Sequence, residues 1–139
     1  KKNKPLLKYL IYTSVPVNFD NDSFHNILEV SQQNNIRDSI TGALIYRPDL
    51  YLQYLEGPVD SIDKTYIRIK NDPRHIEIHQ LAEKTTERRL FTSWAMRGDP
   101  AKTWMWSYED VKNGLIKRFS PKQAFSTFNL VSREIDQFN

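Results

Sequence analysis

The chain has 139 residues, 39% hydrophobic and 27% charged, with no cysteine, which favours one soluble globular domain and excludes disulfides, thiolate metal sites and cysteine nucleophiles. No apolar run approaches the roughly 20 residues of a membrane-spanning helix, and the N-terminus lacks a signal-peptide core, so we expect a cytoplasmic protein without a membrane partner. Removing Lys1, Lys2 and Lys4 takes the net charge from +3 to 0, so the basic character comes from the N-terminal tail and gives little support for a nucleic-acid partner.

The first predicted strand covers residues 6–15, LLKYLIYTSV, and ends at Pro16. It is apolar on both faces, which is typical of a strand inside a sheet. Tyr12 lies near its end. A buried tyrosine needs a partner for its hydroxyl, whereas the ordinary alternative is a tyrosine at the edge of the core with its hydroxyl in solvent.

An amphipathic helix is predicted over residues 23–34, where apolar and small side chains recur at helical spacing: Phe24, Ile27, Leu28 and Ser31. Asn34 and Asn35 end this helix, which suits asparagine because it tolerates the left-handed backbone conformation. Asn35 also lies just before the next strand, so its amide can instead face the same site as Gln53.

A β-hairpin is predicted from two runs of strand-forming residues, 40–46 and 50–55, separated by Arg47-Pro48-Asp49. Alternation in the second strand gives one face with Tyr51, Gln53 and Leu55 and another with Leu52, Tyr54 and Glu56. Gln53 is therefore an amide on a largely apolar face, where its burial is costly unless its donors and acceptors are satisfied. A neighbouring backbone group is the simplest partner.

After Gly57, Pro58 is expected to open a second helix that runs to about residue 71. Four of its side chains share one face: Ile62, Thr65, Tyr66 and Ile69. Arg68 lies next to Ile69 and is either a solvated surface charge or a ligand for a phosphate.

Two further strands are predicted, at residues 76–83 and 90–97. The first should turn Ile76, Ile78 and Leu81 inward. The second places Trp94 and Met96 on one face, which by itself indicates ordinary core. The three histidines form neither a ligand cluster nor a triad, so we expect no metal site and assign them to the surface or the sheet edges: His25, His75 and His79.

Two helices are predicted after Pro100, at residues 103–116, with Asn113-Gly114 near the end, and at residues 121–138, with Ser120 as N-cap. The second carries an apolar stripe formed by Phe125, Phe128, Val131 and Ile135. Such a stripe packs on the open face of the sheet or on a partner.

Together the elements give the order β-α-β-β-α-β with an added strand, which predicts an α+β fold, a ferredoxin-like sandwich followed by two C-terminal helices. This topology hosts unrelated functions, so it predicts no activity.

Five motifs in order carry a more specific resemblance: IYTS (11–14), SQQNN (31–35), ITGALIY (40–46), LQYLEG (52–57) and SWAM (93–96). With 18 residues from Asn35 to Gln53 and 41 from Gln53 to Trp94, the stretch 6–97 resembles the BLUF family, blue-light sensors that use flavin. The resemblance implies a photosensor domain at residues 5–98 and a helical extension at 99–139.

The resemblance also implies roles for individual residues. Tyr12 matches the photoactive tyrosine, Gln53 the switching glutamine, and Trp94 and Met96 the pair that reports the light state. The implied contacts with the cofactor are Asn35 and Asn34 at the polar edge of the flavin, Ile27 and Ile69 on its two ring faces, Arg68 near its phosphate, and Ser31. The implied cofactor is FAD, with FMN or riboflavin as alternative forms.

In the implied mechanism, light makes the flavin an oxidant that takes an electron and then a proton from Tyr12. Gln53 then rotates or tautomerises and donates a hydrogen bond to the flavin C4 carbonyl, which shifts the absorption slightly to the red. The fifth strand passes the change to the C-terminal helices. The resemblance implies a sensor that is not an enzyme and that acts through a homo-oligomer or a separate response protein.

The candidate partner surface comprises Trp104, Trp106, Phe125 and Phe128, for which core packing is the alternative. Other functions remain open. An acylphosphatase-like hydrolase is disfavoured because residues 14–20 offer no Arg or Gly to cradle an anion. A nucleic-acid module is disfavoured by the neutral body, and a flavin-free interaction module is the main rival.

Overall fold

A five-stranded sheet lies at the centre of the computed structural model, which describes residues 6–18, 20, 29, 33–92, 94–98 and 106–138. Within these ranges, the side chains of residues 94–98 and 134–138 are not described. The strands are β1 (Leu7–Pro16), β2 (Thr41–Arg47), β3 (Leu50–Pro58), β4 (His75–Thr86) and β5 (Trp94–Gly98). Their order is β4-β1-β3-β2-β5, with β2 and β5 parallel and the other neighbours antiparallel. As its apolar sequence predicts, β1 lies between two neighbours.

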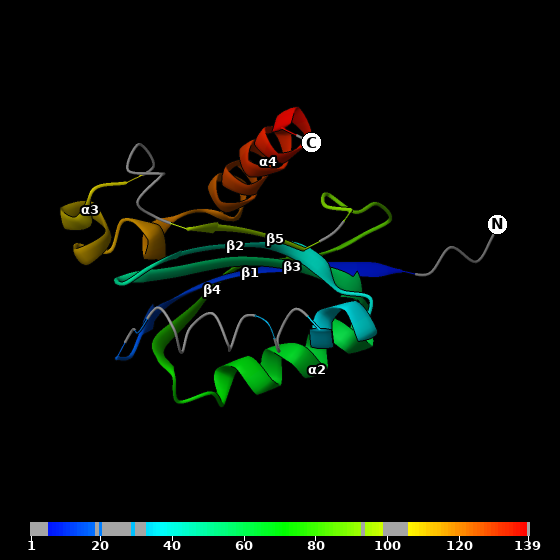
Figure 1. Ribbon diagram of the computed structural model, residues 1–139, viewed down its shortest axis with the longest axis horizontal. Coiled ribbons are helices and arrows are strands. Elements are labelled where there is room, and N and C mark those ends of the chain that lie inside the picture. Colours follow the sequence, from blue (N-terminus) through cyan, green and yellow to red (C-terminus); the bar gives the residue numbers. More distant parts are fainter. Residues whose placement is uncertain are drawn as a thin grey trace.

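The helices cover the two faces of the sheet separately (Figure 1). One face packs against α2 (Val59–Lys70), and the other against α4 (Pro121–Phe138), with the short α3 (Tyr108–Lys112) and the 3-10 turn η1 (Ile116–Arg118) on the same side. We call these the α2 face and the α4 face. The predicted α+β ferredoxin-like fold is confirmed.

Strand alternation sorts the core side chains between the two faces. The cluster on the α2 face contains Leu10, Tyr12, Ile40, Leu55 and Ile62. The larger cluster on the α4 face includes Ile11, Ile45, Leu52, Tyr54, Phe91, Ile116, Ala124, Phe128 and Val131. The sheet therefore has a core on each side.

The hairpin of β2 and β3 and the helix α2 form where the sequence predicts them. Gly42 allows the two strands of the hairpin to approach, because a Cβ added there would lie 1.9 Å from the Tyr54 carbonyl oxygen. Of the helix predicted at residues 23–34, the structure describes Glu29 and residues 33–37 as helical. Ile27 and Ser31 lie outside the described residues.

The N-terminus of α4 is a capping box. The Ser120 hydroxyl oxygen accepts a hydrogen bond from the Gln123 backbone N–H (3.1 Å), and Gln123 Oε1 accepts one from the Ser120 backbone N–H (2.8 Å). Pro121 occupies the first helical position, where it loses no hydrogen bond. Both features agree with the prediction.

The apolar stripe of α4 packs on the sheet. Phe128 is fully buried, so core packing, not a partner surface, accounts for it. Phe125 and Trp106 are half-buried against the same cluster. Trp104 lies outside the described residues.

The helix predicted at residues 103–116 is shorter than expected. Only α3 and η1 form within its described part, and residues 103–105 lie outside it. Asn113 caps α3, and Gly114 follows in the left-handed region with φ of 86°. The Asn-Gly pair therefore ends the helix earlier than predicted.

In β4, the prediction that Ile76 points inward is wrong, because that side chain is 50% exposed. Ile78 and Leu81 pack inward as expected. The register of β1 with β4 shifts between Thr13 and Val15, and Glu77 takes a positive φ of 54°. A bulge of this kind breaks the alternation on which the prediction depends.

Two absences bear on function. No helix among the described residues is long and apolar enough to cross a membrane. Within the described part of the chain, no group of three or more His, Cys, Asp or Glu side chains is arranged to hold a metal ion.

Candidate functional site

The α2 face brings Tyr12 and Gln53 together near the centre of the sheet. They are cross-strand partners on β1 and β3, and they are only 4% and 8% exposed. The Tyr12 hydroxyl donates a hydrogen bond to Gln53 Oε1. Burial, with smaller contributions from Tyr66 and Tyr51, raises the pKa of Tyr12 far above its ordinary value of 10.0. Tyr12 is therefore a neutral hydrogen-bond donor at physiological pH.

Asn35 is a second buried amide, 5% exposed. Its backbone carbonyl accepts a hydrogen bond from the Ile40 N–H (2.8 Å), which ties the helical turn at 33–37 to the start of β2. The neighbouring Asn34 is half-buried, and its carbonyl accepts a hydrogen bond from the Asp38 N–H (3.0 Å). The chain thus fixes both asparagines by their backbones and leaves their side chains available.

The two buried amides have hydrogen-bonding capacity that the described residues leave unused. No described residue bonds to the side-chain amide of Asn35 or to Nε2 of Gln53. An unsatisfied buried polar group costs about 1–3 kcal/mol. These amides therefore indicate a polar ligand on the α2 face.

The last turn of α2 brings an apolar side chain, Ile69, and a cation, Arg68, to the α2 face. Ile69 is half-buried and packs against the cluster that contains Tyr12. The Arg68 side chain is 54% exposed, its Nη2 donates a hydrogen bond to Thr65 Oγ1 (3.1 Å), and it lies 3.7 Å from Asp38 Oδ2. Exposed ion pairs of this kind contribute little. The Arg68 guanidinium is therefore available to an anionic group.

The backbone of β5 lies in register with this site. Met96 is the partner of Leu44 on β2, and Leu44 is in turn the partner of Gln53 on β3. Trp94 lies opposite Gly42, two residues earlier along β5. The side chains of Trp94 and Met96 are not described, so their roles remain predictions from the resemblance.

His75 is the first residue of the edge strand β4, which agrees with the expected edge position, but its side chain is buried and not at the surface. Its Nε2 lies 2.7 Å from the Ile69 carbonyl oxygen, and its Nδ1 lies 2.7 Å from Ser14 Oγ. A carbonyl can only accept, so Nε2 carries the proton. His75 thus connects the end of α2 to β1 two residues beyond Tyr12, and no sequence pattern marks this role.

On the opposite face, Glu56 is fully buried three residues after Gln53. Its carboxylate accepts hydrogen bonds from the backbone N–H groups of Leu90 (2.8 Å) and Phe91 (2.6 Å) and from the Tyr54 hydroxyl (3.1 Å). Burial raises the pKa of Glu56, and these donors oppose that shift. Glu56 therefore holds the segment before β5 against β3, a role that alternation alone did not reveal.

The residues of the α2 face fit a flavin. An isoalloxazine ring needs apolar contact on its faces and amides at its polar edge. Ile69 supplies the first, and the Asn35 amide and Nε2 of Gln53, which have no described partner, supply the second. The exposed guanidinium of Arg68 suits the phosphate.

Comparison with known proteins agrees with this fit. A family model described as "BLUF: Sensors of blue-light using FAD" matches residues 7–97. The matched range runs from β1 into β5 and includes every site residue that the sequence predicted.

Two curated relatives respond to light by name. Photoactivated adenylate cyclase subunit beta of Euglena gracilis is 28% identical over 102 residues, which cover 71% of this chain and 12% of that protein. The blue light- and temperature-regulated antirepressor BluF of Escherichia coli (strain K12) is 31% identical over 55 residues, which cover 40% of this chain and 14% of that protein. The chain matches only a small part of the length of either relative.

Solved structures share the fold. BlrB, a BLUF protein in its dark state, superposes with a TM-score of 0.79 at 23% identity, covering 95% of this chain and 99% of that chain. A bacterial light-regulated adenylyl cyclase gives a TM-score of 0.67 at 30% identity, covering 86% of this chain and 38% of that chain.

Proposed function

The chain belongs to the BLUF family of blue-light sensors that use FAD, and we propose that it is a photoreceptor in which Tyr12 and Gln53 convert light absorption into a change of hydrogen bonding. The buried hydrogen bond from Tyr12 to Gln53, whose Nε2 has no described partner, is the observation that carries this proposal.

The cofactor lies on the α2 face in this proposal. A bound flavin supplies a ring that absorbs blue light and is strongly oxidising once excited. Ile69 packs against one ring face, Asn35 bonds the polar edge, and Arg68 holds the phosphate. The family resemblance adds Ile27 and Ser31, which lie outside the described residues, as further contacts with the cofactor. We propose FAD over riboflavin because the Arg68 guanidinium is 54% exposed and its ion pair with Asp38 is long, at 3.7 Å, so it can also bind a phosphate. Extraction followed by chromatography distinguishes FAD from FMN.

Tyr12 is the electron and proton donor. Its proton is already shared in a hydrogen bond with Gln53 Oε1, so Gln53 is the first acceptor for that proton when Tyr12 is oxidised. When the electron and the proton return, Tyr12 is restored and Gln53 remains in a different hydrogen-bond arrangement. An amide suits this role because its two ends have opposite hydrogen-bond polarity in nearly the same shape.

The output passes through β5. Met96 on β5 is the cross-strand partner of Leu44 on β2, and Leu44 is the partner of Gln53 on β3. A change there reaches the segment before β5, which Glu56 holds, and the C-terminal helices beyond it. A second copy of the chain or a separate response protein receives the change, and the 139 residues themselves act as a sensor without enzymatic activity. Such a relay requires that the dark and lit states differ at a surface that a partner contacts.

The test is the light-minus-dark absorption spectrum of Tyr12→Phe. This variant should bind flavin and show no light-induced shift. Tyr66→Phe is the matched control, because Tyr66 is a tyrosine of the same face with its ring 5.9 Å from that of Tyr12, and it should keep the shift. A Tyr12→Phe protein that still shifts would overturn the proposed role of Tyr12.

A further inference from the structure

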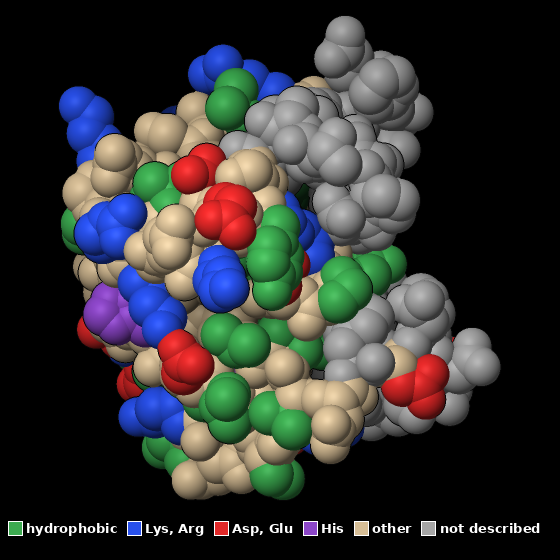
Figure 2. All heavy atoms as spheres, turned by 90° about the vertical axis from the view of Figure 1, so that its left-hand side faces the viewer, with side chains coloured by type: hydrophobic (Ala, Val, Ile, Leu, Met, Phe, Trp, Pro, Cys, Tyr) green, Lys and Arg blue, Asp and Glu red, His purple; other side chains and the backbone are tan. Residues whose placement is uncertain are grey.

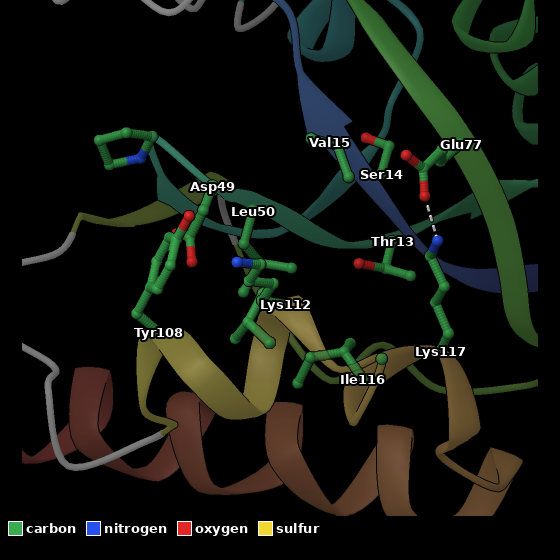
Figure 3. A pocket seen from close by; sticks show the side chains of 13 residues that line it. Thr13, Ser14, Val15, Asp49, Leu50, Glu77, Tyr108, Lys112, Ile116 and Lys117 are labelled. Atoms are coloured by element: carbon green, nitrogen blue, oxygen red, sulfur yellow. Dashed lines mark hydrogen bonds and ion pairs between the residues drawn. The ribbon is translucent and has the colours of Figure 1, made fainter.

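A cavity of about 510 Å³ opens on the α4 face, between the end of β1, the turn from β2 to β3, and the segment that contains α3 and η1 (Figure 3). Its volume lies within the roughly 300–1,000 Å³ typical of small-molecule sites. None of the residues proposed to hold flavin lines it. The cavity is thus distinct from the proposed flavin site.

This end of the molecule exposes hydrophobic side chains among charged ones (Figure 2). Four apolar residues line the cavity: Leu50 and Ile116, which are buried, and Val15 and Val111, which are half-buried. Burial of an apolar group against these side chains is favourable because it removes apolar surface from water. The cavity therefore suits the hydrophobic body of a ligand.

The charged groups around the cavity are paired, with one exception. Asp49 accepts two hydrogen bonds from the Arg47 guanidinium (2.9 and 2.7 Å), and Glu77 forms an ion pair with Lys117. Lys112 forms no ion pair or hydrogen bond with any residue that the structure describes. Figure 3 shows its side chain reaching from α3 into the cavity beside Asp49 and Leu50. Among the described residues, one ammonium group at the cavity therefore has no counter-charge.

The wall formed by β1 and β4 is also irregular. Their pairing shifts register between Thr13 and Val15, and Glu77 holds a positive φ of 54°. Strained residues of this kind gather at functional sites. The strain lies at the cavity, because all three residues line it.

We propose that this cavity binds a small amphipathic anion, a compound with a compact hydrophobic body and one carboxylate, sulfonate or phosphate group. The body packs against Leu50, Val111 and Ile116, and the anionic group lies on Nζ of Lys112. Charge complementarity selects this class of ligand, since the other ionic groups of the cavity already neutralise each other.

Isothermal titration calorimetry of the 139-residue chain in darkness, with FAD in excess, tests the proposal. The probes are 2-naphthalenesulfonate and the neutral 2-naphthalenemethanol. The sulfonate should bind roughly three- to tenfold more tightly than the alcohol, because only the sulfonate gains a charge-assisted hydrogen bond. Absence of binding by the sulfonate, or equal affinity of the two probes, would overturn the proposal.

Two lysine variants locate the anion. Lys112→Met should remove the preference for the sulfonate and leave the binding of the alcohol unchanged. Lys117→Met is the matched control, since Lys117 also lines the cavity but is paired with Glu77, and its effect should stay within about twofold. Equal losses in the two variants would indicate a general effect of charge and contradict a specific site at Lys112.

A third variant locates the hydrophobic body. Val111→Phe places a larger side chain of α3 in the cavity and should weaken the binding of both probes. Tyr12 and Gln53 lie on the α2 face, so this substitution leaves their contacts unchanged. Unchanged binding in a folded Val111→Phe protein would show that the probes bind elsewhere. A protein that fails to bind flavin but passes these tests would overturn the proposed photoreceptor and not this site.

Discussion

Two buried polar side chains, three residues apart on β3, point to opposite faces of the sheet and are treated in opposite ways. On the α4 face, both carboxylate oxygens of Glu56 accept hydrogen bonds from the backbone N–H groups before β5. On the α2 face, Gln53 has a protein partner for its oxygen and no described partner for its nitrogen. Complete pairing stabilises the fold, whereas incomplete pairing leaves capacity for a ligand.

The side chains packed on the Glu56 side of the sheet also differ from those on the Gln53 side. On the α4 face, Tyr54 packs its ring within 5.3 to 5.5 Å of the rings of Tyr9, Phe91 and Phe128. On the α2 face, the cluster consists of four aliphatic side chains and Tyr12, whose ring lies 5.9 Å from that of Tyr66. The α4 face is thus the more aromatic of the two cores, and the α2 face is the one on which we propose that flavin binds.

Replacement of Gln53 should break the function of the α2 face completely. Gln53→Leu removes the acceptor for the Tyr12 hydroxyl, so the light-induced absorption shift should be lost while flavin still binds. Gln80→Leu is the matched control, because Gln80 is the cross-strand partner of Tyr12 on its other side and is exposed, and it should keep the shift. Difference spectroscopy of both variants measures this, and a full shift in Gln53→Leu would contradict the account.

Replacement of Glu56 should instead reduce stability. In Glu56→Gln, the single amide oxygen can accept a hydrogen bond from only one of the backbone N–H groups of Leu90 and Phe91. The NH₂ group of the new side chain faces the other N–H and cannot accept from it. The free energy of unfolding should therefore fall by about 1–3 kcal/mol. The control Glu83→Gln changes an exposed glutamate on β4 that pairs with Lys8, and it should cost less than about 1 kcal/mol. Urea denaturation measures both, and equal losses would refute the special role of Glu56.

Loss of the Asn35 amide should weaken binding without weakening the fold. Asn35→Ala removes a buried amide that has no described partner, so flavin affinity should fall about tenfold, which corresponds to about 1.4 kcal/mol. The stability of the flavin-free protein should stay the same or rise slightly. Gln33→Ala, at an exposed position of the same helical turn, should change neither quantity. Flavin titrations measure the affinities, and a marked loss of flavin-free stability in Asn35→Ala would show a structural role.

The smallest expected effect is that of pH on Tyr12. Because burial raises the pKa of Tyr12 far above 10.0, the folded protein keeps this phenol protonated where an exposed tyrosine begins to ionise. The amplitude of the light-induced shift should therefore remain constant from pH 7 to about pH 9.5. Stability, by contrast, should fall as the pH rises past the pKa that the tyrosine has in the unfolded chain. A decline of the amplitude that follows an ordinary tyrosine titration would contradict the burial of Tyr12.

Much of the fold follows from local sequence patterns. The hairpin, α2, the Ser120 cap and the inner position of β1 depend on alternation, turn residues and capping, all of which act over a few residues. The roles of Tyr12 and Gln53 were predicted from the family resemblance, and the structure makes the two residues cross-strand partners.

The predictions from sequence were wrong or incomplete where segments far apart in the chain contact each other. Ile76 was misplaced because the bulge at Glu77 depends on the pairing of β4 with β1 and breaks the period-two count. His75 and Glu56 were missed because their partners lie far along the chain, at Ser14 and at Leu90. A lone histidine or glutamate in a strand carries no sign of such a partner.

The proposed flavin photosite on the incompletely paired α2 face can be tested in a single measurement. The most direct test is the absorption spectrum of the purified chain after incubation with FAD, recorded in darkness and immediately after blue illumination. The account predicts a protein-bound flavin spectrum that shifts slightly to the red and returns in darkness. A chain that retains no flavin, or a bound flavin whose spectrum is unchanged by light, would contradict it.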